Sequence, residues 1–513
     1  MKLTTLIIIF VGAVNGAKIL GVFFIPSISH QFNYHAIIRE LVLRGHEVTF
    51  ITTNPIRDPK LINLTEVDIS IAYKMFEKFD FATLNRHSMN LFSMVLRCQE
   101  HFRNMIASEM DVEEVKNILN QPENIYDLIL MEDGAPFYRG LGHKFKAPMV
   151  VVSPVSLNIF THKEMGNPIH PVLYPDWFST YTGPVTNIWK KFDSLYVELV
   201  FFIMSELYTI PRSDRMARKY FGNDMPYIKT LMKETSFVIA LANPLVSDRR
   251  PLVPNVIEVW NTHGNRSEVL SGDLKNILDD AVDGVVYFSL GTNVRFEYLE
   301  KNWKQKILQE LGKLPYTVLC KWESDDHPDR PQNVILRKWF PQQSILGHPN
   351  VKVFVTQGGQ YSMEDAISNG VPMVVVPFHN DQFVVAQHLT SRGAAETISS
   401  ESIDFDKLRD TILKVSKNDS YRLKAQELQK ILLDKPRPAH EEVAWWCEYI
   451  IRHKGAKHLR SPSADIPLYE WLMLDMLAVF IAIVFIIYKL LRKLLQIFIG
   501  IFRKEEPKTK KME

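Results

Sequence analysis

The sequence predicts an α/β protein with two parallel β-sheets, followed by a helix that spans a membrane. In both halves of the chain, short apolar runs alternate with segments of helical periodicity, which is typical of strand–helix–strand units. This pattern breaks around Pro251–His263, where prolines precede a polar, charged segment and indicate a linker. Near the C-terminus, Leu472–Tyr488 is a 17-residue stretch whose one charge is Asp475. We therefore expect two domains and one membrane anchor.

The first half begins with a β-strand, an α-helix and a second β-strand. Their loop Ile25–Gln31 lies at the carboxyl end of the first strand, where open α/β sheets bind ligands. The expected elements are strands at Lys18–Phe24, Glu47–Thr52, Asp127–Met131 and Met149–Val152, and a helix at Phe32–Arg44 that Gly45 caps.

The second half is organised around the stretch Trp339–Gln382. An apolar strand, Val351–Val355, runs into the turn Thr356–Gly359, whose sequence is TQGG. A helix is expected from about Gln360 to Asn369, and a second buried strand at Met373–Val376. The two glycines allow the backbone to approach a ligand closely, and the helix start offers unpaired N–H groups to an anion.

Three parts of this stretch together resemble the signature of the UDP-glycosyltransferases, a large family of nucleotide-sugar enzymes. They are the tract WFPQ, the turn TQGG and the closing pair Asp381-Gln382, and the TQGG variant resembles the arthropod branch of the microsomal members. The resemblance implies the GT-B fold, in which two Rossmann-like domains face one another, with the acceptor side first in the chain and the nucleotide side second. It also implies a transferase that uses a UDP-sugar.

The resemblance further implies which residues bind the donor. Trp339 would stack on the uracil and Gln342 would reach its edge, while Asp365 occupies the position of a ribose-binding acid. The other implied contacts are Gly291 and Thr292 after the strand Val285–Leu290, Thr356, Gln357, Gly359 and Ser362 at the phosphate turn, and Asp381 and Gln382 at the sugar hydroxyls.

A histidine in the loop after the first strand is the base that the resemblance implies. That residue is His30, with His35 as the second choice. A neutral imidazole accepts a hydroxyl proton, and a carboxylate has to fix its tautomer. Counting back from Pro148 as the family pattern requires gives Glu132, where the commoner residue is Asp. The adjacent Asp133 stays open as the alternative.

Several residues depart from the commoner family pattern. Gln357 replaces a histidine, Tyr361 replaces an asparagine, and Asp365 is shorter than the usual glutamate. Trp260 and Asn261 stand where paired glycines are frequent. These departures leave open a second function, a catalytically weakened protein of the endoplasmic reticulum membrane that binds UDP or a lipophile without turnover.

Composition argues against two other classes of partner. Lys and Arg number 60 against 58 Asp and Glu, so no nucleic-acid-binding surface is indicated. Cys98, Cys320 and Cys447 are too scattered for a disulfide framework or a metal cluster. Because backbone N–H groups and a helix dipole can stabilise a diphosphate, we expect no metal and no cofactor, the UDP-sugar being a co-substrate. A homo-oligomer is compatible with the sequence.

Both ends of the chain carry targeting signals. Residues 1–16 are interpreted as a secretory signal peptide, residues 472–491 as the transmembrane helix and residues 492–513 as a basic cytosolic tail. Lys510 and Lys511 resemble the dilysine tail of retrieved type I membrane proteins. Between the signals we place an N-terminal domain at 17–255 and a C-terminal domain with a crossover helix at 256–455. Candidate glycan acceptors are Asn63, Asn265 and Asn418.

These features predict an inverting UDP-glycosyltransferase of the endoplasmic reticulum membrane, single-pass and type I, with lumenal catalytic domains. The resemblance implies a small lipophilic acceptor hydroxyl and a role in detoxification. The aromatic- and Met-rich region from about Pro154 to Tyr227 would cover an apolar acceptor cleft, although an ordinary helical core explains it equally well. Glucose is favoured over glucuronic acid, although Arg250 aligns with an arginine used for a carboxylate. Transfer to lipid or protein glycans is a third alternative.

Overall fold

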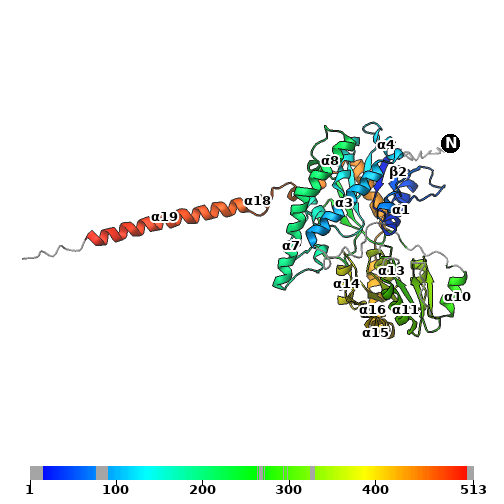
Figure 1. Cartoon of the computed structure of the whole chain (residues 1–513). Helices are drawn as coiled ribbons and strands as arrows, with labels where there is room; N and C mark the ends of the chain where they lie inside the picture. Colours follow the sequence, from blue (N-terminus) through cyan, green and yellow to red (C-terminus); the bar gives the residue numbers. More distant parts are fainter. Residues whose placement is uncertain are drawn as a thin grey trace, which may run out of the picture. The chain divides into compact units, whose positions relative to one another are not determined.

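The computed structural model describes residues 16–76, 90–262, 264, 270, 272–292, 294–296, 299–323, 330–379 and 381–504. It divides into two compact units, residues 1–460 and residues 461–513 (Figure 1). The signal-peptide residues 1–15, the glycan candidate Asn265 and the dilysine pair lie outside the described residues.

The first half of the larger unit contains a seven-stranded parallel sheet in the order β3-β2-β1-β4-β5-β6-β7. Its strands are β1 (Lys18–Phe23), β2 (Glu47–Thr52), β3 (Leu64–Asp68), β4 (Leu128–Glu132), β5 (Met149–Ser153), β6 (Phe237–Ala240) and β7 (Val256–Glu258). Its helices are α1 (Ile28–Leu43), α2 (Ala72–Phe76), α3 (Leu91–Met110), α4 (Glu113–Leu119), α5 (Gly140–Phe145), α6 (Ile159–Met165), α7 (Ile188–Met204), α8 (Ile210–Phe221) and α9 (Ile228–Met232), with the 3-10 helices η1 (Pro136–Arg139) and η2 (Trp177–Ser179) and the π-helix η3 (Ser205–Thr209).

The second half contains a six-stranded parallel sheet in the order β10-β9-β8-β11-β12-β13. Its strands are β8 (Val285–Ser289), β9 (Thr317–Lys321), β10 (Val334–Arg337), β11 (Val351–Thr356), β12 (Met373–Val375) and β13 (Ala395–Thr397). Its helices are α10 (Gly272–Asp280), α11 (Lys301–Gly312), α12 (Gln342–Leu346), α13 (Gln360–Ser368), α14 (Gln382–Ser391), α15 (Phe405–Lys417) and α16 (Asp419–Leu433).

Each sheet has a point where the strand order reverses direction. In the first sheet it lies between β1 and β4, and in the second between β8 and β11. Open α/β sheets bind ligands in the crevice beyond the carboxyl ends of such strand pairs. The residues that directly follow β1 and β4 therefore lie at the first crevice, and those that follow β8 and β11 lie at the second.

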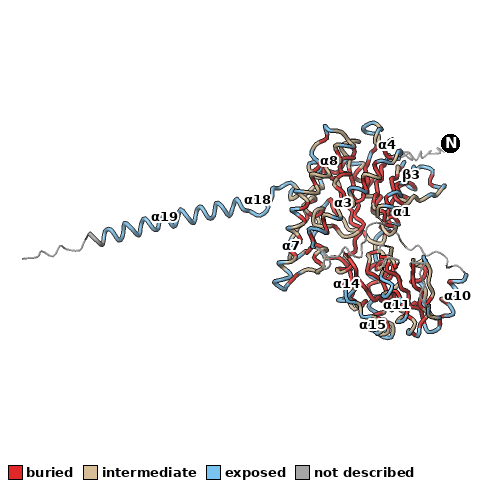
Figure 2. Tube along the Cα trace, in the orientation of Figure 1, coloured by how far each residue is buried: buried red, intermediate tan, exposed pale blue. Residues whose placement is uncertain are grey.

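Apolar side chains on both faces of the strands explain why the sheets are parallel and buried. In the first sheet, Leu20 and Val22 belong to one core cluster, while Ile19 and Phe23 belong to another on the opposite face. This alternation follows from the two-residue repeat of a strand, and helices cover both clusters. Figure 2 shows the buried residues concentrated along the strands of both halves.

The first sheet extends past the expected domain boundary at residue 255. Val256 of β7 pairs with Val238 of β6, so residues 256–258 complete this sheet. Helix α17 (Ala439–Arg452), which lies far along the chain, also packs here, because its Cys447 and Ile450 are buried in a core cluster of the first half.

Helix α1 begins earlier than its apolar periodicity indicates. The expected helix starts at Phe32, but the observed one starts at Ile28. Gln31 accounts for the difference, since its buried amide donates to the carbonyl of Ile25 at 3.1 Å and accepts from the hydroxyl of Thr52 at 2.7 Å. The turn that carries the candidate base is therefore helical rather than a loop.

The smaller unit contains α18 (Leu468–Trp471) and α19 (Leu474–Lys504). Residues 474–501 of α19 are long and apolar enough to cross a membrane and are exposed, as the pale blue helix in Figure 2 shows. At about 1.5 Å per residue such a helix exceeds the roughly 30 Å hydrocarbon thickness. Ile188–Phe221 passes the same test of length and composition, but Val197 and Phe201 within it belong to a core cluster of the first half.

Two of the candidate glycan acceptors can be placed. Asn63 and Asn418 are both exposed. Asn418 is also the N-cap of α16, where its side chain accepts from the backbone N–H of Ser420 at 3.0 Å. A glycan on Asn418 would therefore have to leave this cap oxygen in place.

Candidate active site

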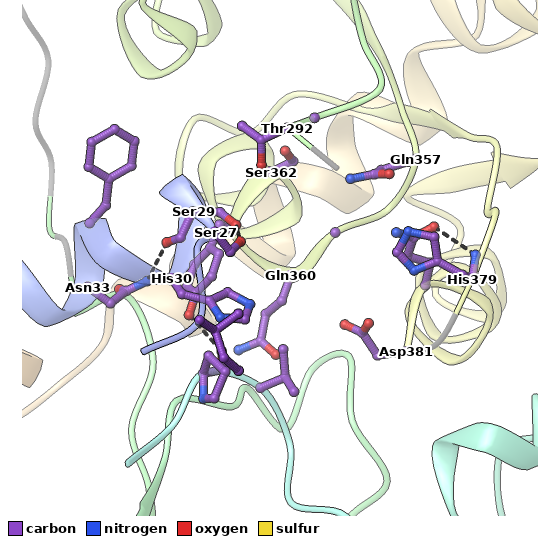
Figure 3. Close-up of a pocket in the computed structure, with 18 of the residues that line it drawn as sticks. Ser27, Ser29, His30, Asn33, Thr292, Gln357, Gln360, Ser362, His379 and Asp381 are labelled. Carbon is purple, nitrogen blue, oxygen red and sulfur yellow. Dashed lines mark hydrogen bonds between the residues drawn. The ribbon is translucent and has the colours of Figure 1, made fainter. Parts of the chain in front are cut away.

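A cavity of about 530 Å³ lies between the two halves of the larger unit, at the carboxyl ends of both sheets. Figure 3 shows His30 on the first-half helix and Asp381, His379 and Gln357 on second-half segments, with the Asp381 carboxylate directed across the cavity. Most of the sequence-predicted site residues line it, namely His30, Asp133, Gly291, Thr292, Trp339, Gln342, Gln357, Gly359, Ser362, Asp365, Asp381 and Gln382.

His30 and Glu132 form a hydrogen-bonded pair at the crevice of the first sheet. His30 lies in the first turn of α1, and Glu132 is the last residue of β4. The Nδ1 atom of His30 is 3.0 Å from Oε1 of Glu132. A carboxylate only accepts hydrogen bonds, so Nδ1 carries the proton and Nε2 is left to accept one.

Two further donors hold the fully buried Glu132 carboxylate. The hydroxyl of Tyr34 donates to Oε1 at 2.9 Å, and the backbone N–H of Ile25 donates to Oε2 at 2.9 Å. Burial, followed by the charge of Glu132, raises the pKa of Tyr34 well above its ordinary value, so this phenol stays protonated and donates. Three donors thus converge on one carboxylate and fix its position.

The alternatives to this pair have other partners. Asp133 lines the cavity, but its carboxylate accepts from the Thr161 hydroxyl at 2.7 Å and faces Arg139 at 3.5 Å. His35 lies on α1 with its Nε2 2.7 Å from the carbonyl of Asn54, and it does not line the cavity. The carboxylate that contacts the candidate base is therefore Glu132.

The glycine turn between β11 and α13 forms the opposite wall. Gly358 has φ +88°, and a Cβ there would lie 2.7 Å from a methyl of Val375, so only glycine fits. A Cβ on Gly291 would lie 2.4 Å from the amide nitrogen of Gln357, which shows how closely these two residues approach. The Gln357 Oε1 atom is buried and has no hydrogen-bond partner among the described residues.

Thr356 is the one predicted donor-binding residue whose side chain does not reach the cavity. It is fully buried, and its hydroxyl accepts from the backbone N–H of Gly358 at 3.3 Å. This hydrogen bond therefore stabilises the glycine turn, although Thr356 itself does not line the cavity. The helix α13 that starts after Gly359 presents its unpaired N–H groups at this place.

The predicted nucleoside end is assembled from α12 and α13. The side-chain amide of Gln342 donates to Asp365 at 2.8 Å and approaches the Ser362 hydroxyl at 3.3 Å. Gln343 donates to the other oxygen of Asp365 at 2.7 Å. Trp339 is 51% exposed at the edge of the cavity, as a platform for a flat ring should be.

The pair Asp381-Gln382 begins α14 on the same wall. Burial raises the pKa of Asp381 to about 6, although the nearby His30 opposes this shift. The side-chain oxygen of Gln382 accepts from the backbone N–H groups of Phe378 and His379 at 2.9 and 3.2 Å, which fixes this amide in the loop. Burial lowers the pKa of His379 to about 4, so this imidazole is neutral near pH 7.

Lys321 is a cavity residue that sequence reasoning missed. Its ammonium group donates to the carbonyl of Gly291 at 2.8 Å, pairs with Glu323 and lies 5.5 Å from the ring centroid of Trp339. It is the last residue of β9, the strand beside β8. Lys321 lies near the Gly291 loop because β9 pairs with β8, and no local sequence signal marks that pairing.

The residues at positions 260 and 261, where glycines are common in the family, form specific contacts here. The Trp260 ring nitrogen donates to the carbonyl of Leu432 at 3.2 Å. Asn261 has φ +54°, a conformation that asparagine tolerates, and its backbone N–H donates to Glu364 at 3.0 Å. Both residues are therefore bonded to neighbouring segments, Trp260 to the end of α16 and Asn261 to α13.

Part of the cavity lining is an apolar wall. Its side chains are Phe76, Met94, Val95, Cys98, Phe102, Phe160, Trp177, Phe178 and Phe201, from α2, α3, α6, η2 and α7. The aromatic region after Pro154 thus contributes to a cleft, as expected, while the share supplied by α3 was not expected. Among the described residues, no group of three or more His, Cys, Asp or Glu side chains is placed to hold a metal ion.

Comparison with known proteins shows which family the chain belongs to. The family model described as "UDP-glucoronosyl and UDP-glucosyl transferase" matches residues 18–505. The chain belongs to the UDP-glycosyltransferase family. UDP-glucosyltransferase 2 of Dactylopius coccus is 30% identical over 483 residues, which cover 92% of each chain. UDP-glucuronosyltransferase 1A8 of Rattus norvegicus is 27% identical over 494 residues, which cover 90% of this chain and 89% of the relative.

Solved structures show the same fold for this UDP-glycosyltransferase. The glycosyltransferase VinC, whose crystal structure contains dTDP, matches with a TM-score of 0.55 and 16% identity, covering 85% of this chain and 99% of that one. The glycosyltransferase of kitacinnamycin matches with a TM-score of 0.53. The expected GT-B architecture of two parallel sheets with helices is therefore confirmed.

Proposed function

We propose that this UDP-glycosyltransferase transfers glucose, with inversion, from UDP-glucose to a hydroxyl of a small lipophilic acceptor. The observation that carries the proposal is the arrangement of one cavity. The His30–Glu132 pair lies on its first-half wall, and the glycine turn with the start of α13 lies on its second-half wall. The first pair supplies a base, and the turn supplies N–H groups for a diphosphate.

The proposed reaction is a single displacement. His30 Nε2 takes the proton of the acceptor hydroxyl, and the hydroxyl oxygen forms a bond to the anomeric carbon. The bond from that carbon to the β-phosphate oxygen breaks, and UDP leaves with the electron pair. Glu132 keeps the imidazole in the tautomer that accepts at Nε2 and stabilises the imidazolium that forms.

Donor binding is assigned to the second half. Trp339 and Gln342 would hold the uracil and Asp365 the ribose, as in the family pattern. Lys321, which also pairs with Glu323, donates to the carbonyl of Gly291, beside which the diphosphate would lie. The unpartnered Oε1 of Gln357 favours a ligand with hydroxyl donors, because a buried acceptor without a partner costs about 1–3 kcal/mol.

The surroundings of Arg250 favour glucose over glucuronic acid. Arg250 does not line the cavity, and its guanidinium group lies 5.2 Å from the ring centroid of Tyr174. Burial lowers the pKa of Arg250, and four carboxylates oppose that effect, those of Asp176, Asp248, Glu258 and Glu198. Its guanidinium group donates to the carbonyl of Tyr174 at 3.5 Å, whereas the predicted sugar position lies beside the carboxylate of Asp381.

The apolar wall indicates the class of acceptor. Aromatic and aliphatic side chains on this wall would bury a lipophilic body while its hydroxyl reaches His30. A charged glycan or a polar peptide would lose hydration there without compensation. The wall therefore favours a small alcohol or phenol over lipid-linked or protein glycans.

We also propose that α19 spans the membrane of the endoplasmic reticulum, with the larger unit in the lumen. The apolar first part of α19, followed in the middle of the helix by the basic residues Lys489, Arg492 and Lys493, supports a type I orientation. The catalytic steps assigned above need no metal, since the start of α13 offers unpaired N–H groups and the positive end of its dipole to the diphosphate.

The test of this function is a donor comparison. With microsomes that contain the full chain and a panel of phenols and alcohols, we expect kcat/KM for UDP-glucose to exceed that for UDP-glucuronate by about 100-fold, a difference of about 2.7 kcal/mol. NMR of the product should show an inverted anomeric centre. A higher kcat/KM with UDP-glucuronate would refute the choice of glucose as the transferred sugar. Retention of configuration at the anomeric centre would refute the single displacement. Binding of UDP without turnover would favour the alternative, a catalytically weakened binding protein.

Asp381 predicts a pH dependence of donor binding. Its pKa of about 6 means that the carboxylate is ionised above this pH and protonated below it. If the ionised form accepts the sugar hydroxyls, the KM for UDP-glucose is low above about pH 6 and rises as the pH falls through this value. Steady-state kinetics from about pH 5 to 8 measure this.

Asp381→Asn is the matched control for this dependence. The amide does not titrate, so its KM should be raised about 10- to 100-fold and stay flat over the same pH range. A wild-type KM that is flat across pH 6, or an Asp381→Asn variant with the same slope as the wild type, would remove Asp381 from the sugar site.

A further inference from the structure

The first two side chains of α13 leave their own half and bond to the first half. The amide of Gln360 donates to the carbonyl of Leu241, and the hydroxyl of Tyr361 donates to the carbonyl of Pro154 at 2.6 Å. Leu241 and Pro154 directly follow β6 and β5. The helix that begins at the glycine turn is therefore bonded to the carboxyl edge of the opposite sheet.

The polypeptide that connects the halves reinforces this junction. The hydroxyl of Thr262 donates to Asn33 of α1, and the backbone N–H of Asn261 donates to Glu364 of α13 at 3.0 Å. Thr262, Asn33 and Glu364 are all buried. Buried hydrogen bonds are costly to break without replacement. The contacts thus restrict movement of α13 relative to α1, the helix that carries the candidate base.

Tyr361 touches that base directly. Its ring lies edge-on to the imidazole of His30, with ring centroids 6.3 Å apart and an interplanar angle of 65°. Burial, followed by the charges of Glu364 and Glu132, raises the pKa of Tyr361 well above its ordinary value, so its hydroxyl remains a donor. One residue therefore packs against the imidazole and bonds to the sheet edge behind it.

We propose that Tyr361 is a positioning residue for His30 and that Gln360 acts with it. Resting on the proposed function, their two bonds would set the distance between the imidazole of the first half and the glycine turn of the second. A misplacement of about 1 Å between reacting groups can cost a factor of about 100 in rate. The same bonds would keep water from the anomeric carbon.

The test removes the Tyr361 hydroxyl and keeps the ring. For Tyr361→Phe we expect kcat for glycoside formation to fall about 10- to 100-fold, while the Kd for UDP changes less than about twofold, since the assigned UDP contacts lie in the second half. We also expect more UDP-glucose to be hydrolysed per glycoside formed. Coupled UDP release, product chromatography and calorimetry of the full-length protein in detergent measure these quantities.

Tyr316→Phe is the matched control. Tyr316 lies in the same half as Tyr361 and is buried, and its hydroxyl is 3.0 Å from that of Ser416. Neither Tyr316 nor Ser416 lines the cavity. Tyr316→Phe should lower Tm about as much as Tyr361→Phe and leave kcat and hydrolysis unchanged. Tyr361→Phe that behaves like this control would overturn the positioning role, as would a UDP affinity that falls in parallel with kcat.

Two further variants keep the outcome interpretable. If Tyr361→Phe fails to fold, Gln360→Met tests the same junction through the Leu241 bond and should likewise lower kcat while the Kd for UDP stays nearly unchanged. A Gln360→Met variant with the kcat of the wild type would overturn the proposal. His30→Ala separates the two ideas. Turnover lost in His30→Ala but unchanged in Tyr361→Phe refutes the positioning role alone, whereas turnover retained in His30→Ala refutes the base on which it depends.

Discussion

We expect His30→Ala to lower kcat for glycoside formation by about 1,000-fold while the Kd for UDP stays within about twofold of the wild type. The variant removes the group assigned to take the acceptor proton, and a general base contributes typically 10²–10⁴-fold. UDP should still bind, because its assigned contacts come from Trp339, Gln342 and the glycine turn of the other half. Single-turnover kinetics with UDP-glucose and calorimetry with UDP measure the two effects.

His35→Ala is the matched control for this prediction. His35 lies on the same helix, but its Nε2 bonds to the carbonyl of Asn54 and it does not line the cavity. Its removal should change stability more than kcat. If His35→Ala abolished turnover and His30→Ala did not, the base would have been assigned to the wrong histidine.

Much of the fold could be predicted because its signals are local in the chain. The apolar run Val351–Val355 predicts β11 to within one residue, and Val285–Leu290 does the same for β8. Gln357 and Gly359 of the TQGG turn, and the Asp381-Gln382 pair, line the cavity. Buried parallel strands form continuous apolar runs, and a glycine turn is defined by a few consecutive residues. Both can therefore be recognised in the sequence without tertiary information.

What could not be predicted depends on contacts between distant segments. The bond from Tyr361 to Pro154 joins residues 207 positions apart, and no periodicity records it. The early start of α1 depends on Gln31 reaching Thr52 on the next strand. Lys321 becomes a site residue because β9 lies beside β8 in the sheet. Strand order is a property of the folded chain, and the run of residues along β9 does not reveal its neighbour.

The choice between Glu132 and Asp133 shows the same limit on a smaller scale. Adjacent residues near a strand end point in different directions, so one of the two faces α1 and the other does not. The sequence could not say which, since the face that α1 covers is set by packing. The structure turns Glu132 to His30 and Asp133 to Thr161.

Glu132→Gln should lower kcat by about 100-fold or more with a smaller effect on UDP binding. The amide has one acceptor oxygen where the carboxylate has two, and its NH₂ group would face one of the donors on His30, Tyr34 or the backbone of Ile25. The imidazole would then lose its fixed tautomer and the partner that stabilises its cation. Glu132→Asp, which restores the commoner residue of the family, should lose less because the negative charge remains.

Glu109→Gln is the control that separates loss of the carboxylate from loss of a buried acid in general. Glu109 is fully buried in the same half and accepts from the hydroxyl of Tyr138 at 2.8 Å. Burial raises the pKa of Glu109 well above its ordinary value and thereby favours the neutral acid, which an amide of similar shape replaces with little change. Its kcat should stay near the wild type, and an equal fall in both variants would mean that any polar change in this core disables the enzyme.

Glu132→Ala extends the argument to stability. It leaves the hydroxyl of Tyr34 and the N–H of Ile25 buried without their acceptor, at about 1–3 kcal/mol each. The free energy of unfolding should therefore fall by about 2–6 kcal/mol in denaturant titrations, and turnover should fall at least as far as in Glu132→Gln. A stable Glu132→Ala enzyme with nearly full kcat would show that the imidazole needs no carboxylate, and the proton transfer proposed here would lose its physical basis.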